Sequence, residues 1–190
     1  MVKNRFSTAA CWAFGAATIA FAAVAEIAMG RKMWGISGEP GVWSGDVNSS
    51  HNSQFMTDPY SFSHVTHGVL LYALLWLLAR NVPVRVRALM VLMVESSWEI
   101  FENTDMIIQR YRAATISLHY YGDSVMNSMC DILACMVGFG LAYVLPPRVS
   151  IVAVVVLELT LALWIRDGLF LNIIMLIHPV PAIRAWQSAG

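Results

Sequence analysis

The sequence contains few charged residues. They make up 13% of the 190 residues, about half of what is typical of soluble domains, whereas 58% of the residues are hydrophobic. This combination excludes an ordinary water-soluble domain and indicates that lipid surrounds the protein. The 12 basic and 12 acidic residues give a formal net charge of zero. Electrostatics therefore gives no reason to expect a nucleic-acid partner.

Cysteine is also scarce. The three cysteines, Cys11, Cys130 and Cys135, all lie inside apolar stretches. Their spacing matches neither a metal motif nor a disulfide framework. We expect them to be small, buried hydrophobic side chains.

Hydrophobic runs of about 20 residues, the length that crosses a bilayer, predict a single-domain, all-α integral membrane protein. We expect a bundle of about five transmembrane helices, over residues of about 8–29, 61–79, 87–110, 123–145 and 149–165. The first run resembles a signal peptide, but we expect an uncleaved span. Residues 30–60 form a long polar loop rich in glycine and asparagine. Residues 169–177 cover only about 14 Å as a helix, so they predict a short re-entrant or interfacial helix.

The orientation follows from the short basic turn after the second span. Arg80, Arg85 and Arg87 lie on the same side of the membrane as the N-terminus. Basic residues in short loops favour the cytoplasmic side. We therefore expect a cytoplasmic N-terminus.

Polar residues of three spans should meet on the opposite side. The second span begins there with His64 and His67, the third arrives with Glu95, Glu99 and Glu102, and the fourth leaves with Asp123, Asn127 and Asp131. At about 1.5 Å per residue, most of these lie roughly 6–12 Å below the surface, with Glu95 deeper. The alternating directions of the spans place them in one leaflet whichever way the protein is inserted.

The spacing of these residues also predicts which way they face. The three glutamates follow an i, i+4, i+7 pattern, and Asp123, Asn127 and Asp131 repeat every four residues, so each set forms one helical stripe. Charged groups that face lipid cost several kcal/mol. We therefore expect a shared polar pocket between the second, third and fourth spans, covered by the first loop.

Clustered carboxylates cannot all be ionised without compensation. Either some hold a proton at neutral pH or a cation lies among them. Imidazole with carboxylate suits zinc, iron or manganese, and carboxylate alone suits magnesium. The expected ligands of a divalent metal ion are His64, His67, Glu99, Glu102, Asn127 and Asp131. In the alternative interpretation, the acids pair with the histidines, or with Arg110 and Arg112, and only fix the packing of the helices.

Chemical roles can be assigned within this pocket. Glu95, Glu99, Asp123 and Asp131 are the expected catalytic acids and bases, and the histidines are ligands or proton shuttles. Tyr120 and Tyr121 are either interfacial anchors or lie at the pocket mouth. Arg166 and Asp167 end the last span on the pocket side, where they either bind an anionic headgroup or pair with each other.

Several segments resemble a known family. They are Ser61–Gly68, Glu95–Thr104, Gly122–Asp131, Asn52-Ser53-Gln54 and Trp164–Asp167. Together they are similar to an alphaproteobacterial membrane family, domain of unknown function 2585, and the Glu95-to-Glu99 and Gly122-to-Asp131 segments are more distantly similar to VanZ-like membrane proteins. The resemblance implies a bacterial inner-membrane location but no activity. Members of the family carry a Cys-x-Cys element in the first loop and a histidine after Asn-Ser-Gln. Here the loop reads Arg31 to Gly35 and Phe55 follows Gln54, which implies that any metal-binding capacity of those family residues is lost.

Three functions are compatible with these patterns. The first is a membrane-embedded, metal-dependent hydrolase or transferase that acts on a lipid or lipid-linked substrate through an outer-leaflet pocket. The second is a non-catalytic accessory or assembly subunit of a larger membrane complex, with the Ala-rich first span and aliphatic fifth span as packing faces. The third is a proton- or cation-coupled carrier that uses the acidic stripes as a relay, which the apolar remainder of the second and fourth spans disfavours.

Overall fold

The computed structural model describes residues 7–35, 38–115, 117 and 120–189, and within these ranges the regular structure is entirely helical. The helices, in chain order, are α1 (Thr8–Ala28), α2 (Ser61–Leu78), α3 (Val84–Glu102), α4 (Asp105–Ala114), α5 (Val125–Val144), α6 (Pro147–Trp164), α7 (Leu169–Ile177) and α8 (Pro181–Ser188). The sequence-based prediction of an all-α membrane protein is confirmed.

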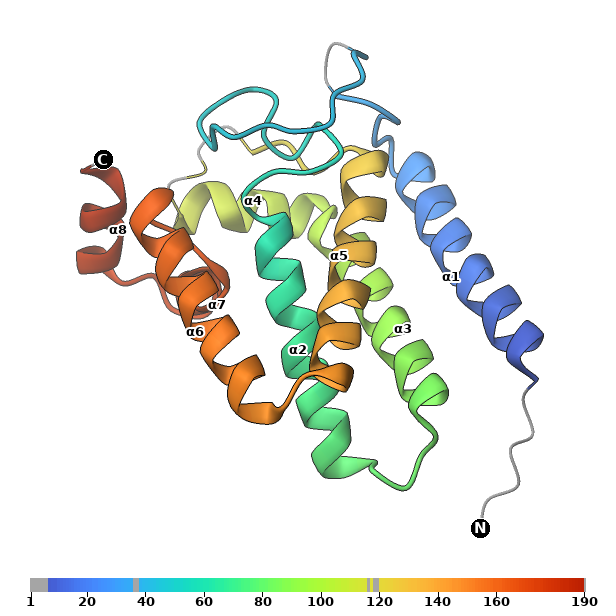
Figure 1. Cartoon of the computed structure of the whole chain (residues 1–190). Coiled ribbons are helices and arrows are strands. Elements are labelled where there is room, and N and C mark those ends of the chain that lie inside the picture. The colour runs from blue at the N-terminus through green and yellow to red at the C-terminus, as the bar shows by residue number, and fades with distance from the viewer. Residues whose placement is uncertain (1–6, 36–37, 116, 118–119, 190) are drawn as a thin grey trace.

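Long helices form the body of the protein. Among the described residues, α1, α2, α5 and α6 are long and apolar enough to cross a membrane. The 19-residue α3 runs beside them in the bundle, although its charged residues lower its hydropathy. In Figure 1 the first residues of α1 lie at the opposite end of the bundle from the loop between α1 and α2. Among the described residues the bundle therefore has five long helices, and four of them qualify as candidate membrane spans.

The closest helix pair is α2 with α5, and two glycines make it possible. A Cβ atom on Gly68 would lie 1.9 Å from the carbonyl oxygen of Cys135, and one on Gly138 would lie 2.0 Å from the carbonyl oxygen of Val65. The two backbones are thus in direct contact, as small residues allow in membrane helix packing. This contact fixes α2, with its two histidines, against α5.

Two hydrophobic clusters complete the core. Ala22 of α1, Leu92 of α3 and Ile132 of α5 form one of them. Val91 of α3 packs against Cys135 and Phe139 of α5 in the other. Both clusters centre on α5, so this helix is the element against which the others are positioned.

The predicted third span, 87–110, is too long at its C-terminal end. The helix stops at Glu102, and α4 then runs across the bundle (Figure 1). Asn103 bonds back to the carbonyl oxygen of Glu99 through both its main-chain N–H and its side chain, and Thr104 is extended, with φ −74° and ψ 149°. Side chains of Asn and Thr compete in this way with helix continuation. Asp105 then stabilises the positive N-terminus of α4.

The predicted fourth span, 123–145, begins two residues too early. Ser124 is extended, and its hydroxyl accepts a hydrogen bond from the N–H of Asn127, so it caps α5. Asp123 therefore precedes the helix, and the prediction of one stripe with Asn127 and Asp131 is wrong for this residue.

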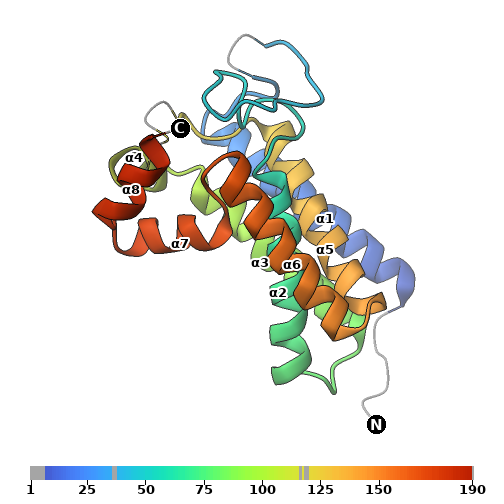
Figure 2. The ribbon, with the colours of Figure 1, turned by 60° about the vertical axis from the view of Figure 1, so that its left-hand side comes forward.

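Short helices extend the side of the bundle away from the N-terminus. Residues 169–177 do form a helix, α7, which runs across the direction of α6 (Figure 2). Helix α8 was not predicted, although Pro181 in its first turn is a common start signal.

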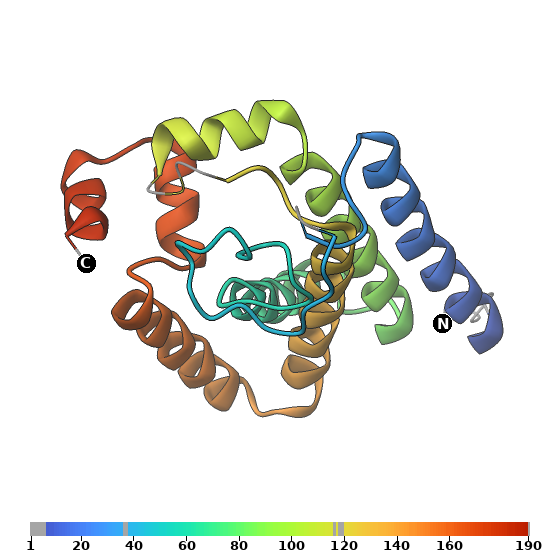
Figure 3. The ribbon, with the colours of Figure 1, turned by 90° about the horizontal axis from the view of Figure 1, so that it is seen from above.

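The loop between α1 and α2 covers the end of the bundle (Figure 3). The side chain of Gln54 donates to the carbonyl oxygen of Gly122, and the N–H and hydroxyl of Ser124 donate to the carbonyl oxygens of Ser53 and Gln54. Trp43 stacks on Trp164 at the end of α6. These contacts tie the loop to the start of α5 and to the end of α6.

Candidate functional site

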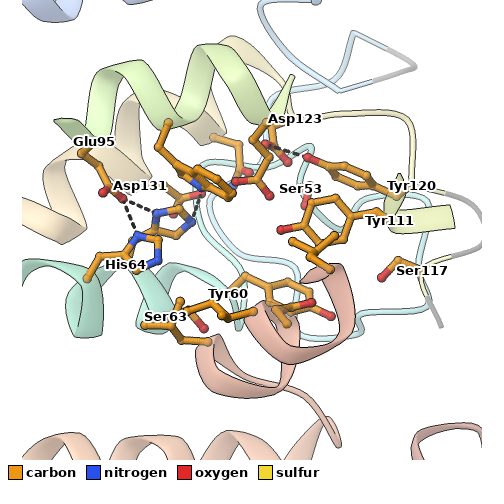
Figure 4. A pocket seen from close by; sticks show the side chains of 18 of the residues that line it. Ser53, Tyr60, Ser63, His64, Glu95, Tyr111, Ser117, Tyr120, Asp123 and Asp131 are labelled. Atoms are coloured by element: carbon orange, nitrogen blue, oxygen red, sulfur yellow. Dashed lines mark hydrogen bonds and ion pairs between the residues drawn. The ribbon is translucent and has the colours of Figure 1, made fainter. Parts of the chain in front are cut away.

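A cavity of about 370 Å³ lies beneath the loop, between α2, α3, α4, α5 and α7. Figure 4 shows its polar side chains converging from these elements. The polar lining residues are Asn52, Ser53, Tyr60, Ser63, His64, His67, Glu95, Glu102, Tyr111, Ser117, Tyr120, Asp123, Asn127, Asp131 and Asn172. The predicted shared pocket is therefore present, and it contains residues from all three of the spans expected to form it.

At the deep end, two histidines share one carboxylate. The Nδ1 atoms of His64 and His67 lie 2.6 and 3.0 Å from the same oxygen, Oε1 of Glu95. One helical turn separates the two histidines, which places both rings over the glutamate of α3. Glu95 is 1% exposed, so this centre is shielded from water. One ligand atom from each of the three residues fits within a 4.8 Å span, a separation at which they can hold one metal ion.

A second carboxylate lies beside this centre without a hydrogen bond. Glu99 Oε1 is 3.3 Å from His64 Nδ1, and Asp131 Oδ2 is 3.9 Å from His64 Nε2 on the other side of the ring. Glu99 is fully buried, and neither of its oxygens accepts a hydrogen bond from the described residues. Asp131 Oδ1 and Asn127 Nδ2 are likewise buried without a partner there.

The arginines expected to neutralise these acids bind elsewhere. Arg110 donates to the carbonyl oxygen of Leu176, and Arg112 donates to that of Tyr120 and lies over the ring of Tyr121. Among the described residues, neither lysine nor arginine lines the cavity. The alternative in which Arg110 and Arg112 pair with the acids is therefore wrong, and acidic side chains outnumber basic ones among the described residues that line the cavity.

Asp123 and Tyr120 form a second polar group nearer the mouth. The Tyr120 hydroxyl donates to Asp123 Oδ2 at 3.0 Å, and the amide of Asn103 donates to the same oxygen at 3.3 Å. Burial, reinforced by the neighbouring Asp58, raises the pKa of the Asp123 carboxyl from 3.8 to about 7. A carboxyl group with this pKa can both hold and release a proton near neutral pH.

Glu102 also lies in this outer part of the cavity, against Tyr111 and Trp98 rather than beside the histidines. The structure thus divides the predicted metal ligands between two groups. His64, His67, Glu99 and Asp131 lie at the deep centre, Asn127 lines the wall beside it, and Glu102 is closer to Asp123.

The remaining predicted substrate residues lie outside the cavity. Asp167 is 1% exposed and accepts hydrogen bonds from the Tyr60 hydroxyl, the Gly168 N–H and the Gln187 amide, so it holds the α7 connection in place. Burial raises its pKa to about 6. Arg166 faces a separate cleft and donates to the carbonyl oxygen of Trp186. Tyr121 is exposed beneath Arg112. Of Tyr120 and Tyr121, only Tyr120 lines the cavity.

One wall of the cavity is apolar and reaches the outside of the bundle. Leu70 of α2, Val94 of α3 and Ile173 of α7 line the cavity, yet they are 38%, 51% and 43% exposed. Trp98 and Leu176 continue the same wall. The apolar wall of the cavity thus consists partly of side chains that are also exposed on the outside of the bundle.

Sequence reasoning missed several residues that shape the site. Asn103 holds Asp123 and also donates to Ser128, and its position four residues after Glu99 extends the glutamate stripe. Asp58 is 1% exposed and accepts from the N–H groups of Ser53 and Tyr60, which fixes the loop. The Asp58-Pro59 pair is a turn signal in the sequence, but nothing there indicates that Asp58 is buried.

Comparison with known proteins relates the chain to one family and to several of its bacterial relatives. Residues 26–189 match the family described as protein of unknown function, DUF2585, and these residues include the whole cavity lining. A UPF0314 protein of Sinorhizobium fredii is 52% identical over 147 residues, which cover 77% of this chain and 75% of the relative. One of Paracoccus denitrificans is 47% identical over 171 residues, covering 90% of this chain and 89% of the relative. No solved structure matches the chain. The more distant likeness to VanZ-like proteins stays a prediction.

Proposed function

Because the chain belongs to the DUF2585 family, whose description names no activity, we propose a function from the cavity: a membrane-embedded hydrolase or transferase that acts on a lipid or lipid-linked substrate. One observation carries the proposal. A single cavity joins a buried histidine–carboxylate centre to an apolar wall that faces lipid.

The shape of the cavity favours an amphiphilic substrate. Its volume of about 370 Å³ lies within the range of small-molecule sites. A polar headgroup fits the end lined by the histidines and acids, and an acyl or prenyl chain fits along Leu70, Val94 and Ile173. Such a substrate enters from the bilayer without leaving the apolar phase.

The polar residues can supply acid–base catalysis. The histidines, oriented by Glu95, can take a proton from water or from another molecule that accepts the transferred group. Asp123, with its pKa of about 7, can give a proton to the leaving group. Two groups of opposite role within one cavity are what hydrolysis or group transfer requires.

We also propose the bacterial inner membrane as the location, with a cytoplasmic N-terminus and the cavity in the outer leaflet. The alphaproteobacterial relatives and the turn with Arg80, Arg85 and Arg87 on the N-terminal side support this orientation. Alkaline phosphatase fused after α8 should be active, and green fluorescent protein fused there should not fluoresce. The reverse pair of results contradicts the orientation.

The activity can be tested with the purified full-length protein in nanodiscs. We expect incubation with a total lipid extract of an alphaproteobacterium to convert one lipid class, detected by mass spectrometry as loss or transfer of a headgroup. Glu95→Gln should abolish the conversion. Glu158→Gln is the matched control, because Glu158 is an acid of α6 that bonds the N–H of Phe170 away from the cavity.

Equal lipid profiles with and without the wild-type protein contradict the proposed function. Stable co-purification with a larger complex, together with unaltered function of that complex when His67 is replaced by Gln, supports the accessory-subunit alternative instead.

A further inference from the structure

We infer that His64, His67 and Glu95 bind one divalent transition-metal ion of the zinc class, with Glu99 as the second carboxylate beside it. The inference deepens the proposed function and rests on it for the ion's chemical role, since the ion lies at the reactive end of the cavity. Binding of the ion is measurable without any substrate.

The distances fit such a site. The Nδ1 atoms of His64 and His67 are 2.6 and 3.0 Å from Glu95 Oε1, and Glu99 Oε1 is 3.3 Å from the His64 nitrogen. Ligand atoms around a tetrahedral zinc ion are separated by roughly 3.3 Å, given bonds of about 2.0–2.1 Å. Small side-chain shifts therefore convert the hydrogen-bonded cluster into a coordination shell.

The charge balance gives an independent reason. Glu99 is fully buried, and both its oxygens are without a hydrogen bond from any described residue, although one of them faces His64. A buried carboxylate without a hydrogen bond requires either a proton or a compensating charge. Arg110 and Arg112 do not supply that charge, because they bind carbonyl oxygens. One divalent cation balances the charges of Glu95 and Glu99 together.

The donor set indicates the class of metal. Two imidazoles and a carboxylate suit zinc, iron or manganese, whereas magnesium prefers oxygen ligands and retained water. Three protein ligands is also the number found in catalytic zinc sites, where the fourth position holds water or substrate. With both histidines bound to the ion, Glu99 replaces them as the base and is placed to accept a proton from such a water molecule.

Asp131 is a positioning residue in this arrangement. When the Nδ1 atom of His64 binds metal, its Nε2 carries the proton, and Asp131 Oδ2 lies 3.9 Å from that Nε2. This distance is longer than a hydrogen bond, and a small side-chain shift would bring Asp131 to the position in which carboxylates orient metal-binding histidines and increase their basicity. Its replacement should weaken metal affinity by about 10–100-fold without removing a ligand.

The test is a metal titration of the full-length protein in detergent after treatment with a chelator. We expect one zinc ion per chain by plasma mass spectrometry, and cobalt(II) should give the intense visible absorption of a tetrahedral site. Glu95→Gln and His67→Gln should lower the affinity for zinc by more than about 100-fold, since outer partners alone are worth about 10–100-fold. Asp131→Asn should keep the cobalt spectrum and lower affinity within that smaller range.

His51→Gln is the control, because His51 lies in the loop stacked on Phe55. Each variant must show the same cooperative thermal unfolding as the wild type when metal is absent. A folded protein that binds no zinc, or a His51 variant that loses as much affinity as the His67 variant, overturns the inference.

The metal site and the proposed activity can fail separately. Zinc binding with no lipid conversion keeps the site and rejects the enzyme. Lipid conversion by metal-free protein keeps the enzyme and rejects the site.

Discussion

Replacing Gly68 with alanine tests the arrangement that brings the cavity together. The new Cβ atom would lie 1.9 Å from the carbonyl oxygen of Cys135 and 2.6 Å from the N–H nitrogen of Phe139. Ordinary contact distances begin at 3.4 Å, so α2 and α5 must separate locally by about 1.5 Å. The atoms in conflict belong to the backbone and cannot rotate away as a side chain does.

The expected cost follows from these distances. Overpacking a tight interface costs about 1–3 kcal/mol, and contact with backbone favours the upper end. Alanine is a better helix former than glycine by about 1 kcal/mol, which offsets part of that cost. We therefore expect Gly68→Ala to lower the free energy of unfolding by about 2 kcal/mol.

Gly140→Ala on α5 is the matched control. No atom lies within 4 Å of a Cβ at this position, so only the gain in helix propensity remains, about 0.5–1 kcal/mol. Unfolding by a denaturing detergent in mixed micelles, followed by circular dichroism, gives both free energies. The cobalt affinity of Gly68→Ala should fall as well, because His64 and His67 lie on the same segment of α2. Equal stabilities of the two variants, within about 0.5 kcal/mol, would refute the close α2–α5 contact.

Three further predictions concern the outer part of the site. Asp123→Asn should flatten the pH dependence of the melting temperature. In the wild-type protein the pKa of the Asp123 carboxyl is raised to about 7 by folding. Its contribution to stability is therefore complete below about pH 4 and is lost as the pH rises through 7. An unchanged slope contradicts the buried acid. Gly122→Ala should destabilise by about 2 kcal/mol in the same detergent titration, since a Cβ there meets the Asn103 side chain at 2.8 Å at a φ of +86°. Gly30→Ala has the same φ with open space around it, so it should cost only the backbone strain of about 1 kcal/mol; equal losses would show that the contact is unimportant. Tyr60→Phe should cost about 1 kcal/mol by removing the hydrogen bond to Asp167, and no change in chemical unfolding argues against that bond.

The sequence was sufficient to predict the bundle and the shared pocket. Span length and apolar composition determine which segments cross a membrane, and alternating directions then determine which ends meet. The i, i+4 spacing of Glu95 and Glu99 was enough to place both on the face that reaches His64. These features depend on helical geometry alone, which is the same in every membrane helix.

Other features depend on contacts that no local pattern encodes. The helix break at Asn103 depends on a side chain that turns back to Glu99 and forward to Asp123. The sharing of one Glu95 oxygen by two imidazoles depends on how closely α2 approaches α3. The separation of Arg166 from the cavity depends on α8, a helix too polar to stand out in a hydropathy profile.

The close approach of α2 and α5 at Gly68 and Gly138 also bears on how a substrate can reach the cavity. Below the histidines, α2 and α5 meet backbone to backbone, and Val91, Cys135 and Phe139 fill the adjoining space. Under the proposed function, reactant and product enter and leave from the same half of the bilayer, which favours the enzyme over the proton- or cation-coupled carrier.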